Sequence, residues 1–215
     1  MQADKSPLLL PPGRRGLIAI LRGLRPQEAL AIADVLIESG FSAIEVPLNS
    51  PEPYKSIEKI SALYQDQALI GAGTVLQALE VERVANAGGQ LIISPNVEKT
   101  VIERSKQLGL ISMPGVLTPT EAHLALRCGA SALKFFPASL LGPAGISAIK
   151  TILPANTPIG AVGGVDEDSF AAYFQAGVRL FGIGSNLYKP GDDHQSVKRK
   201  AQRLIAAYDK LQQPG

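Results

Sequence analysis

Short apolar runs alternate along the chain with longer segments in which apolar residues recur every three or four positions. The short runs are typical of buried strands, and the longer segments are typical of amphipathic helices, most of them ended by a glycine. The pattern predicts strands at residues 17–21, 42–48, 68–72, 90–94, 110–113, 132–136, 158–162 and 180–183. It predicts helices at residues 26–39, 51–64, 77–87, 99–108, 119–128, 145–153, 166–176 and 195–211.

This strict alternation predicts parallel strands joined by right-handed crossovers. Eight such units can close into an α/β fold of the (β/α)₈ TIM barrel type, and the 215 residues lie near the low end of its length range. A doubly wound open sheet is the alternative, but it usually has fewer strands and a glycine-rich turn after the first. Here the first strand ends in Arg22-Gly23, which favours the barrel. We therefore expect a single barrel domain at residues 17–215, preceded by an N-terminal arm at residues 1–16.

Composition narrows the class of partner. The formal net charge of +2 gives no reason to expect a polyanion such as nucleic acid. Arg14 and Arg15 lie between prolines and glycines without a basic helix or an aromatic platform, so a solvated arm is favoured over a nucleic-acid contact. Leu8–Leu10 is too short for a secretory signal, and no apolar run approaches the ~18 residues of a membrane helix. We expect a cytoplasmic protein that binds no membrane.

The single cysteine, Cys128, cannot form an internal disulfide, and we expect it to be a small core residue. His123 falls in a predicted helix and His194 in a polar loop. Neither has other metal-ligating residues at a useful spacing, which argues against a metal site.

Lys134 is the most unusual residue of the predicted strands. Side chains alternate along a strand, so Ala132, Lys134 and Phe136 share one face of an apolar run. An ammonium group surrounded by hydrocarbon is costly, and its pKa falls from about 10.4 toward neutrality. Such a lysine is a nucleophile for a carbonyl carbon. Lys134 is therefore either a catalytic amine or half of a buried structural ion pair, and the first is favoured.

Glu45 is an inward candidate from the second predicted strand, in phase with Ala43 and Pro47. The second and sixth strands are both even-numbered, so Glu45 and Lys134 can belong to one layer of inward side chains. A carboxylate facing an amine suits imine chemistry, in which the amine attacks a ketone and the carboxylate moves protons. The alternative is a mutually neutralising pair that only fills the barrel.

Two more polar residues fall at carboxyl ends of strands, where barrel enzymes carry their catalytic groups. Arg22 follows the first strand in phase with Ile18 and Ile20, and Thr74 follows the third in phase with Ile70 and Ala72. With Arg22 and Thr74 at the same end as Glu45 and Lys134, the functional interpretation is favoured.

Glycine clusters follow the seventh and eighth predicted strands, at Gly163-Gly164 and at Gly182-Ile183-Gly184-Ser185. Glycine lets backbone N–H groups approach an anion closely, and loops after these two strands commonly bind phosphate in barrels. A Gly-Gly pair alone is often only a turn, but two clusters at these positions favour a phosphate site.

Six motifs occur in order between residues 17 and 190: Ala19-Ile20-Leu21-Arg22-Gly23, Ile44-Glu45-Val46-Pro47-Leu48, Gly71-Ala72-Gly73-Thr74-Val75, Pro114-Gly115-Val116 with Thr118-Pro119-Thr120-Glu121, Leu133-Lys134-Phe135-Phe136-Pro137 and Val162-Gly163-Gly164-Val165. In order and spacing they resemble the class I aldolases that act on 2-keto-3-deoxy-6-phospho sugar acids. The resemblance implies a homotrimeric lyase without metal or cofactor, in which Lys134 forms the Schiff base and Glu45 is the general acid/base. It further implies binding of the pyruvyl carboxylate by Arg22, Thr74, Gly73 and Pro95, packing of Phe136 against the reacting carbons, and binding of phosphate by Gly163, Gly164, Gly184 and Ser185.

Two positions bear on the configuration of the substrate. The gluconate-type enzymes of this family tend to have an arginine where this chain has Asn49, and a threonine where it has Val162. The chain therefore resembles the galactonate-type enzymes, with Asn49 and Val162 contacting the substrate. This implies cleavage of 2-dehydro-3-deoxy-6-phosphogalactonate to pyruvate and D-glyceraldehyde 3-phosphate. Use of the gluconate epimer, or of both, is the alternative within the family.

Two rivals come from other classes. A phosphosugar isomerase or epimerase on the same barrel would need an acid/base pair but no imine-forming lysine. A non-catalytic phosphosugar-binding protein would bind ligand without product, and it leaves the interior Glu45 and Lys134 unexplained.

Overall fold

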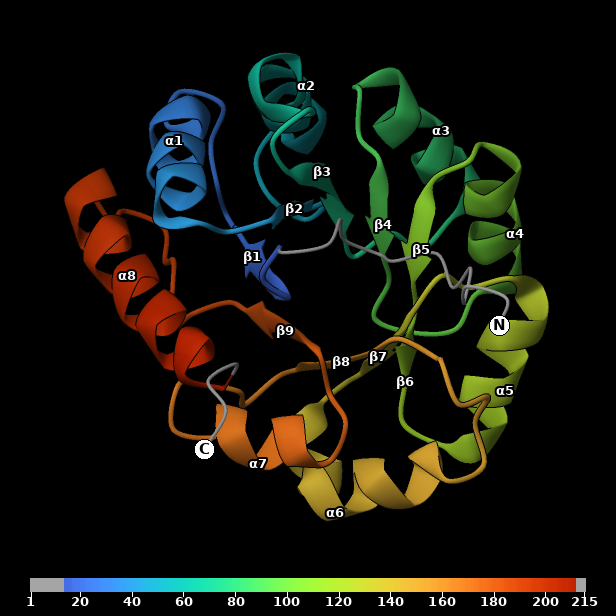
Figure 1. The fold of residues 1–215 in the computed structure, drawn as a ribbon. Helices are drawn as coiled ribbons and strands as arrows, with labels where there is room; N and C mark the ends of the chain where they lie inside the picture. Colours follow the sequence, from blue (N-terminus) through green and yellow to red (C-terminus); the bar gives the residue numbers. More distant parts are fainter. Residues whose placement is uncertain (1–13, 212–215) are drawn as a thin grey trace, which may run out of the picture.

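The computed structural model describes residues 14–211, and in this part of the chain strands and helices alternate around a central barrel (Figure 1). The strands are β1 (Leu17–Ile20), β2 (Ala43–Pro47), β3 (Leu69–Gly73), β4 (Leu91–Ile93), β5 (Ile111–Met113), β6 (Gly115–Val116), β7 (Leu133–Phe135), β8 (Ile159–Val162) and β9 (Leu180–Ile183). Each pairing between neighbouring strands is parallel. The predicted α/β barrel is confirmed.

The helices lie outside the strands and cover the barrel all round (Figure 1). They are α1 (Ala29–Ser39), α2 (Pro53–Tyr64), α3 (Ala78–Asn86), α4 (Lys99–Gln107), α5 (Pro119–Cys128), α6 (Ala138–Lys150), α7 (Phe170–Gln175) and α8 (His194–Lys210). None of the helices between residues 14 and 211 is long and apolar enough to cross a membrane.

The barrel closes at β5 and β6, which form one extended passage of the chain interrupted at Pro114. β5 pairs with β4, and β6 pairs with β7, at the two ends of the strand order. The Ser112 carbonyl accepts hydrogen bonds from the N–H groups of Ser131 (2.9 Å) and Ala132 (3.2 Å), and the Pro114 carbonyl accepts one from Lys134 (3.0 Å). Because Pro114 has no N–H to donate, the ladder is interrupted there. The predicted strand at residues 110–113 corresponds to β5, and β6 is a further short strand that was not predicted, so the described residues form nine strands rather than eight.

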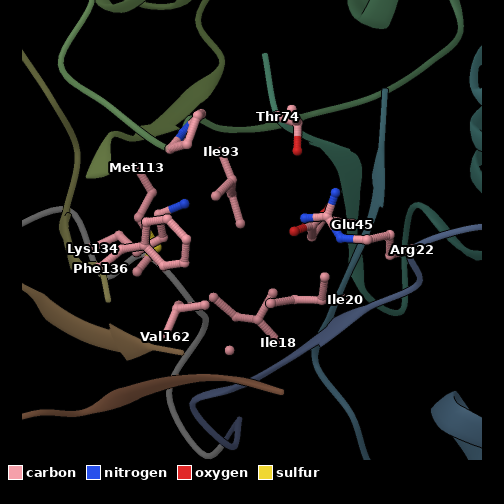
Figure 2. Close-up of a pocket in the computed structure, with 12 residues that line it drawn as sticks. Ile18, Ile20, Arg22, Glu45, Thr74, Ile93, Met113, Lys134, Phe136 and Val162 are labelled. Carbon is pink, nitrogen blue, oxygen red and sulfur yellow. The ribbon is translucent and has the colours of Figure 1, made fainter. Parts of the chain in front are cut away.

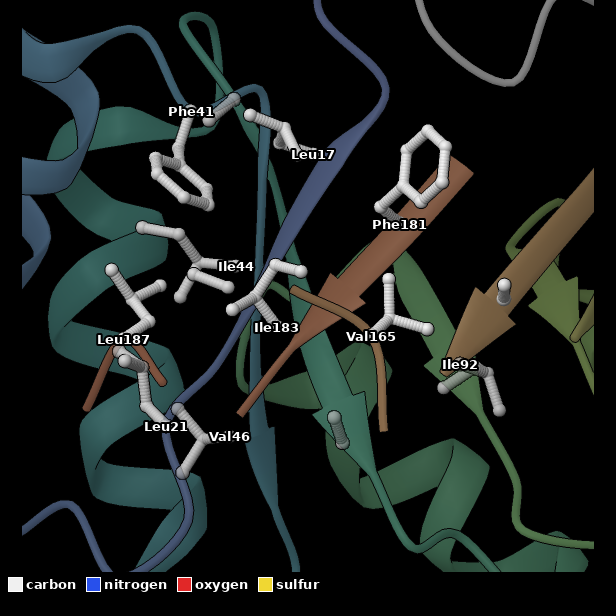
Figure 3. Packing of buried hydrophobic residues seen from close by; sticks show 14 of the residues in the cluster. Leu17, Leu21, Phe41, Ile44, Val46, Ile92, Val165, Phe181, Ile183 and Leu187 are labelled. Atoms are coloured by element: carbon white, nitrogen blue, oxygen red, sulfur yellow. The ribbon is translucent and has the colours of Figure 1, made fainter. Parts of the chain in front are cut away.

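Two apolar clusters lie on opposite faces of the strands. Outward side chains pack against the helices, and Figure 3 shows part of this core around Ile44 and Phe181. The Phe181 ring centroid lies 4.7 Å from that of Phe170 in α7 and 6.1 Å from that of Tyr208 in α8. Cys128 is buried in the same core, as predicted. The smaller cluster is formed by inward side chains, namely Ile18, Ala43, Leu91, Ile93, Met113, Ala132 and Leu180.

Three helices begin three or more residues away from their predicted starts. α1 begins at Ala29 because residues 26–28 form a turn. α6 begins at Ala138, before the predicted start at residue 145, and it breaks at Gly142, whose φ of 63° and ψ of 174° are not helical, just before Pro143. α7 is limited to residues 170–175 because Asp166 and Ser169 close a turn, with the Asp166 N–H 2.9 Å from Ser169 Oγ and the Ser169 N–H 3.0 Å from Asp166 Oδ1.

The start of the described chain is tied to the last helix. The Arg15 guanidinium donates hydrogen bonds to both carboxylate oxygens of Asp209, at 2.6 and 2.8 Å, and the Gly16 N–H donates to the Tyr208 hydroxyl at 3.0 Å. The predicted solvated arm is therefore wrong for Arg15, which a bidentate ion pair holds against α8. Residues 1–13 of the predicted arm lie outside the described residues, and the boundary at residue 17 stays a prediction.

Candidate active site

A pocket lies at the carboxyl ends of the barrel strands, with its polar and apolar lining shown in Figure 2. The residues predicted to act on the substrate that line it are Arg22, Glu45, Thr74, Pro95, Lys134, Phe136 and Val162. The structure thus brings together side chains from loops and strands spread over most of the sequence.

Lys134 occupies the middle of β7, between the outward and fully buried Leu133 and Phe135. Its side chain is 6% exposed, and its ammonium nitrogen lies 4.8 Å from the centre of the Phe136 ring. No group among residues 14–211 accepts a hydrogen bond from this nitrogen. Burial lowers the pKa of Lys134 to about 8; the positive charge of Arg22 also lowers it, while Glu45 raises it. The amine is therefore partly neutral near pH 7.

Glu45 lies in β2 with 4% of its surface exposed, and its Oε2 atom has no hydrogen-bond partner in the part of the chain that the structure describes. Burial raises the pKa of Glu45 to about 7, against the lowering effects of Lys134, of Arg22 and of a hydrogen bond from the Gly73 backbone. A Cβ atom added at Gly73 would lie 2.0 Å from Glu45 Oε2. Gly73, predicted to bind the substrate carboxylate, therefore lies directly against the Glu45 carboxyl group.

Glu45 and Lys134 face each other across the pocket, with Arg22 beside Glu45 and Phe136 beside Lys134 (Figure 2). Among the ion pairs formed within residues 14–211, none joins Glu45 to Lys134. A structural pair would be expected to be in contact, because only close approach offsets the desolvation of two charges. The separated arrangement leaves room for a reacting group between acid and amine.

Arg22 follows β1 and points into the pocket in phase with Ile18 and Ile20, as predicted. Its Nη1 atom donates a hydrogen bond of 2.7 Å to Oδ1 of Asn49, in the loop after β2. Asn49 itself does not line the pocket. The structure therefore places Asn49 behind Arg22, in contact with the guanidinium and outside the pocket lining, where a substrate contact was expected.

Thr74 reaches the pocket by a route that strand alternation does not predict. Ile70 and Ala72, with which it is in phase, belong to the outward core. A further step of regular strand would turn Thr74 outward as well. Thr74 instead has a φ of +57°, in the left-handed region that β-branched residues rarely adopt, and its side chain lines the pocket. Backbone strain of this kind is often stored at functional sites.

The two glycine loops lie next to each other beside the pocket. Gly163 follows β8, and a Cβ atom there would lie 3.4 Å from the Phe136 ring. Asn186, in the loop after β9, donates a hydrogen bond of 3.5 Å to the carbonyl of Val165. Gly164 and Ser185 are exposed to solvent, and Gly184 is partly exposed. The predicted phosphate residues therefore lie on neighbouring loops, of which the one with Gly163 is beside the Phe136 ring.

Several pocket residues were not singled out from the sequence. These are the apolar lining residues Ile18, Ile20, Ile93 and Met113, whereas Gly182, which also lines the pocket, belongs to the second predicted glycine cluster. Strand alternation could have found most of them, because each is an inward position near the end of a strand. Ser50, whose Oγ accepts a hydrogen bond of 2.9 Å from the Gly23 N–H, has no comparable signature in the sequence. Within residues 14–211, no group of three or more histidine, cysteine or acidic side chains is placed to hold a metal ion.

Known proteins match this chain over nearly its whole length. The family model "Aldolase: KDPG and KHG aldolase" matches residues 14–200. A "Probable 2-dehydro-3-deoxy-6-phosphogalactonate aldolase" of Rhizobium meliloti (strain 1021) is 55% identical over 206 residues, which are 96% of each chain. A "2-dehydro-3-deoxy-6-phosphogalactonate aldolase" of Escherichia coli (strain K12) is 48% identical over 190 residues, 88% of this chain and 91% of the relative. A solved "Native KDPGal structure" superposes with a TM-score of 0.90 at 45% identity, covering 92% of this chain and 96% of that chain.

Proposed function

The chain belongs to the KDPG and KHG aldolase family, and from this membership we propose that it cleaves 2-dehydro-3-deoxy-6-phosphogalactonate to pyruvate and D-glyceraldehyde 3-phosphate. A member of this family is a carbon–carbon lyase, which favours the aldolase over the isomerase and the non-catalytic binding protein. One observation carries the proposal: Lys134 is a buried amine of lowered pKa, without an ion-pair partner among residues 14–211, facing a carboxyl group of raised pKa.

Apart from water, the proposed reaction uses only groups of the chain. Neutral Lys134 attacks the C2 ketone, and Glu45 supplies the proton with which the hydroxyl leaves as water, giving a protonated imine. Glu45, now ionised, removes the proton of the C4 hydroxyl. The C3–C4 bond breaks with its electron pair moving into the imine, so that the aldehyde departs and an enamine remains. Glu45 returns its proton to the enamine, and addition of water to the resulting imine, with Glu45 taking up the released proton, frees pyruvate and Lys134.

Pocket geometry supports distinct binding roles for the two ends of the substrate. Arg22, Thr74 and Pro95 all line the pocket, and the Arg22 guanidinium suits the pyruvyl carboxylate. Phe136 contributes an apolar wall beside Lys134. The exposed backbone at Gly163, Gly164 and Gly184, with the Ser185 hydroxyl, is suited to the phosphate.

The choice of the galactonate epimer rests on Val162 and on the relatives. Val162 lines the pocket at the end of β8 and offers no hydrogen-bonding group to the C4 hydroxyl. Both curated relatives compared above are named as galactonate-type aldolases. The gluconate epimer has the opposite configuration at C4. Its C4 hydroxyl would meet the same apolar wall, without a hydrogen-bonding side chain at position 162.

Comparison of the two epimers tests this assignment. Pyruvate release is followed with a lactate dehydrogenase coupling assay, and kcat/KM is compared between the two sugar acids. We expect the galactonate epimer to be preferred, and Val162→Thr to shift the ratio toward the gluconate epimer by restoring a hydroxyl at that wall. A wild-type ratio near one, or a preference for the gluconate epimer, would reject the assignment.

Assembly and location also remain proposals. We expect a homotrimer, and several exposed apolar side chains offer area for contacts between copies: Leu63 (57% exposed), Leu79 (53%), Leu140 (74%) and Ile152 (51%). Sedimentation equilibrium would give the mass of three chains, and a monomer would contradict the expectation. A cytoplasmic location accords with a phosphorylated metabolite as substrate.

A further inference from the structure

The loop after β2 contacts the loop after β1 at two consecutive residues. Asn49 Oδ1 accepts a hydrogen bond of 2.7 Å from Arg22 Nη1, and Ser50 Oγ accepts one of 2.9 Å from the Gly23 N–H. Ser50 is 7% exposed, so its hydrogen bond is sheltered from water. One loop thus holds both the side chain of Arg22 and the backbone that follows it.

The backbone around Arg22 is fixed independently of Asn49. The Leu21 N–H donates 3.0 Å to the carbonyl of Glu45, and a Cβ atom added at Gly23 would lie 2.6 Å from the Pro190 ring. The long side chain of Arg22 lacks such support, since Asn49 is its sole hydrogen-bond partner among residues 14–211. An arginine side chain loses considerable rotamer freedom when it is held in one place. Asn49 is therefore placed to hold the guanidinium in the pocket before the substrate arrives.

We propose that Asn49 is a positioning residue for Arg22, which it orients toward the substrate carboxylate, and that it does not itself contact the substrate. The proposal deepens the function proposed above and rests on it. It replaces the expectation from the sequence that Asn49 touches the substrate, because Asn49 does not line the pocket while Arg22 does.

The orientation of Arg22 also affects the other reacting groups. The positive charge of Arg22 lowers the pKa values of both Lys134 and Glu45. A guanidinium that swings away from the pocket would lose part of this influence. Release of Arg22 should therefore raise the pKa of Lys134, which a purely structural effect of the Asn49 substitution would not do.

A double-mutant cycle tests the proposal. Wild type, Asn49→Ala, Arg22→Ala and the double variant are compared by the pyruvate concentration that gives half-maximal borohydride trapping, and by kcat/KM for the sugar acid. Loss of one hydrogen bond to a charged group predicts that Asn49→Ala raises the half-maximal pyruvate concentration about tenfold. The same substitution should have no further effect in the Arg22→Ala background. Asn86→Ala, at an exposed asparagine that ends α3, is the matched control and should behave as wild type.

If Asn49→Ala raised the half-maximal pyruvate concentration by the same factor in the wild-type and Arg22→Ala backgrounds, the proposal would be overturned, since Asn49 would then act on the substrate directly. An unchanged half-maximal concentration in Asn49→Ala would overturn it too. The pH midpoint of trapping should move upward in Asn49→Ala, and an unmoved midpoint would count against the role. If the sugar acid is not cleaved, but the double-mutant cycle measured with pyruvate shows that the effects of Asn49→Ala and Arg22→Ala are coupled, the proposed substrate is wrong and the role of Asn49 stands. Normal cleavage without coupling rejects only the role.

Discussion

Glu45→Gln tests the electrostatic coupling on which the catalytic interpretation depends. The substitution removes a charge that raises the pKa of Lys134 and leaves a side chain of nearly the same volume. The pKa of Lys134, about 8 in the wild type, should fall further in the variant. The amine of the variant should therefore be neutral at a lower pH than that of the wild type.

The expected magnitude follows from the fraction of neutral amine. With a pKa of about 8, roughly 10% of Lys134 is neutral at pH 7. An ordinary lysine with a pKa of about 10.4 is only about 0.04% neutral at that pH. Lys134 should thus react with an electrophile roughly 200-fold faster than an ordinary lysine of equal accessibility. Glu45→Gln should increase the reactivity at pH 7 further, toward the limit set by a fully neutral amine.

Trace acetylation with acetic anhydride from pH 6 to 11, followed by peptide mass mapping, measures this titration without requiring turnover. Acetylation of N-acetyl-lysine amide in the same tube corrects for reagent hydrolysis. Glu58→Gln, at an exposed position of α2, is the matched control and should leave the Lys134 midpoint unchanged. If the pH midpoint of Lys134 acetylation in the wild type were at or above about 10.4, burial would not be the dominant influence on the pKa of Lys134. A midpoint that is unchanged or raised in Glu45→Gln would refute the coupling.

Three further substitutions test separate parts of the site. Thr74→Gly should relieve the backbone strain of φ +57° and raise the free energy of unfolding, measured in urea titrations, by on the order of 1 kcal/mol. The same substitution should increase KM, and an unchanged KM would show that Thr74 does not contact the substrate. Lys134→Met should stabilise the fold at pH 7 by up to about 3 kcal/mol, because a lysine whose folded-state pKa is lowered to about 8 costs stability below its unfolded-state pKa. This gain should vanish as the pH rises toward 10.5, and a gain independent of pH would contradict the desolvation argument. Ser185→Ala should raise KM for the phosphorylated acid about tenfold and leave pyruvate trapping unchanged, whereas an effect on both would argue against a phosphate contact.

The strands were predictable because each is an apolar run of a length that only a buried strand accommodates, set off by glycine or proline. Arg22, Glu45 and Lys134 could be placed inside the barrel from alternation alone, and the inward Ala43 and Ala132 confirm the phase. β6 was the exception, because the strand predicted at residues 110–113 was expected to end at Pro114, whereas the chain pairs again with β7 just beyond that proline.

Local backbone geometry and contacts between loops could not be predicted in the same way. Thr74 enters the pocket through a left-handed conformation that alternation does not anticipate. The start of α6 was missed because Gly142 and Pro143 look like a loop, although the chain turns helical before them. The contact of Arg22 with Asn49 joins loops 27 positions apart in the sequence, and its existence depends on how the two strands are paired.

Borohydride trapping with pyruvate, followed by peptide mass mapping, shows whether Lys134 forms an imine with the substrate carbonyl group. We expect a reduced pyruvyl adduct on Lys134, formed in the wild type and absent from Lys134→Ala. An unmodified Lys134 in a large excess of pyruvate, or an adduct confined to another lysine, would contradict the imine chemistry proposed for this barrel.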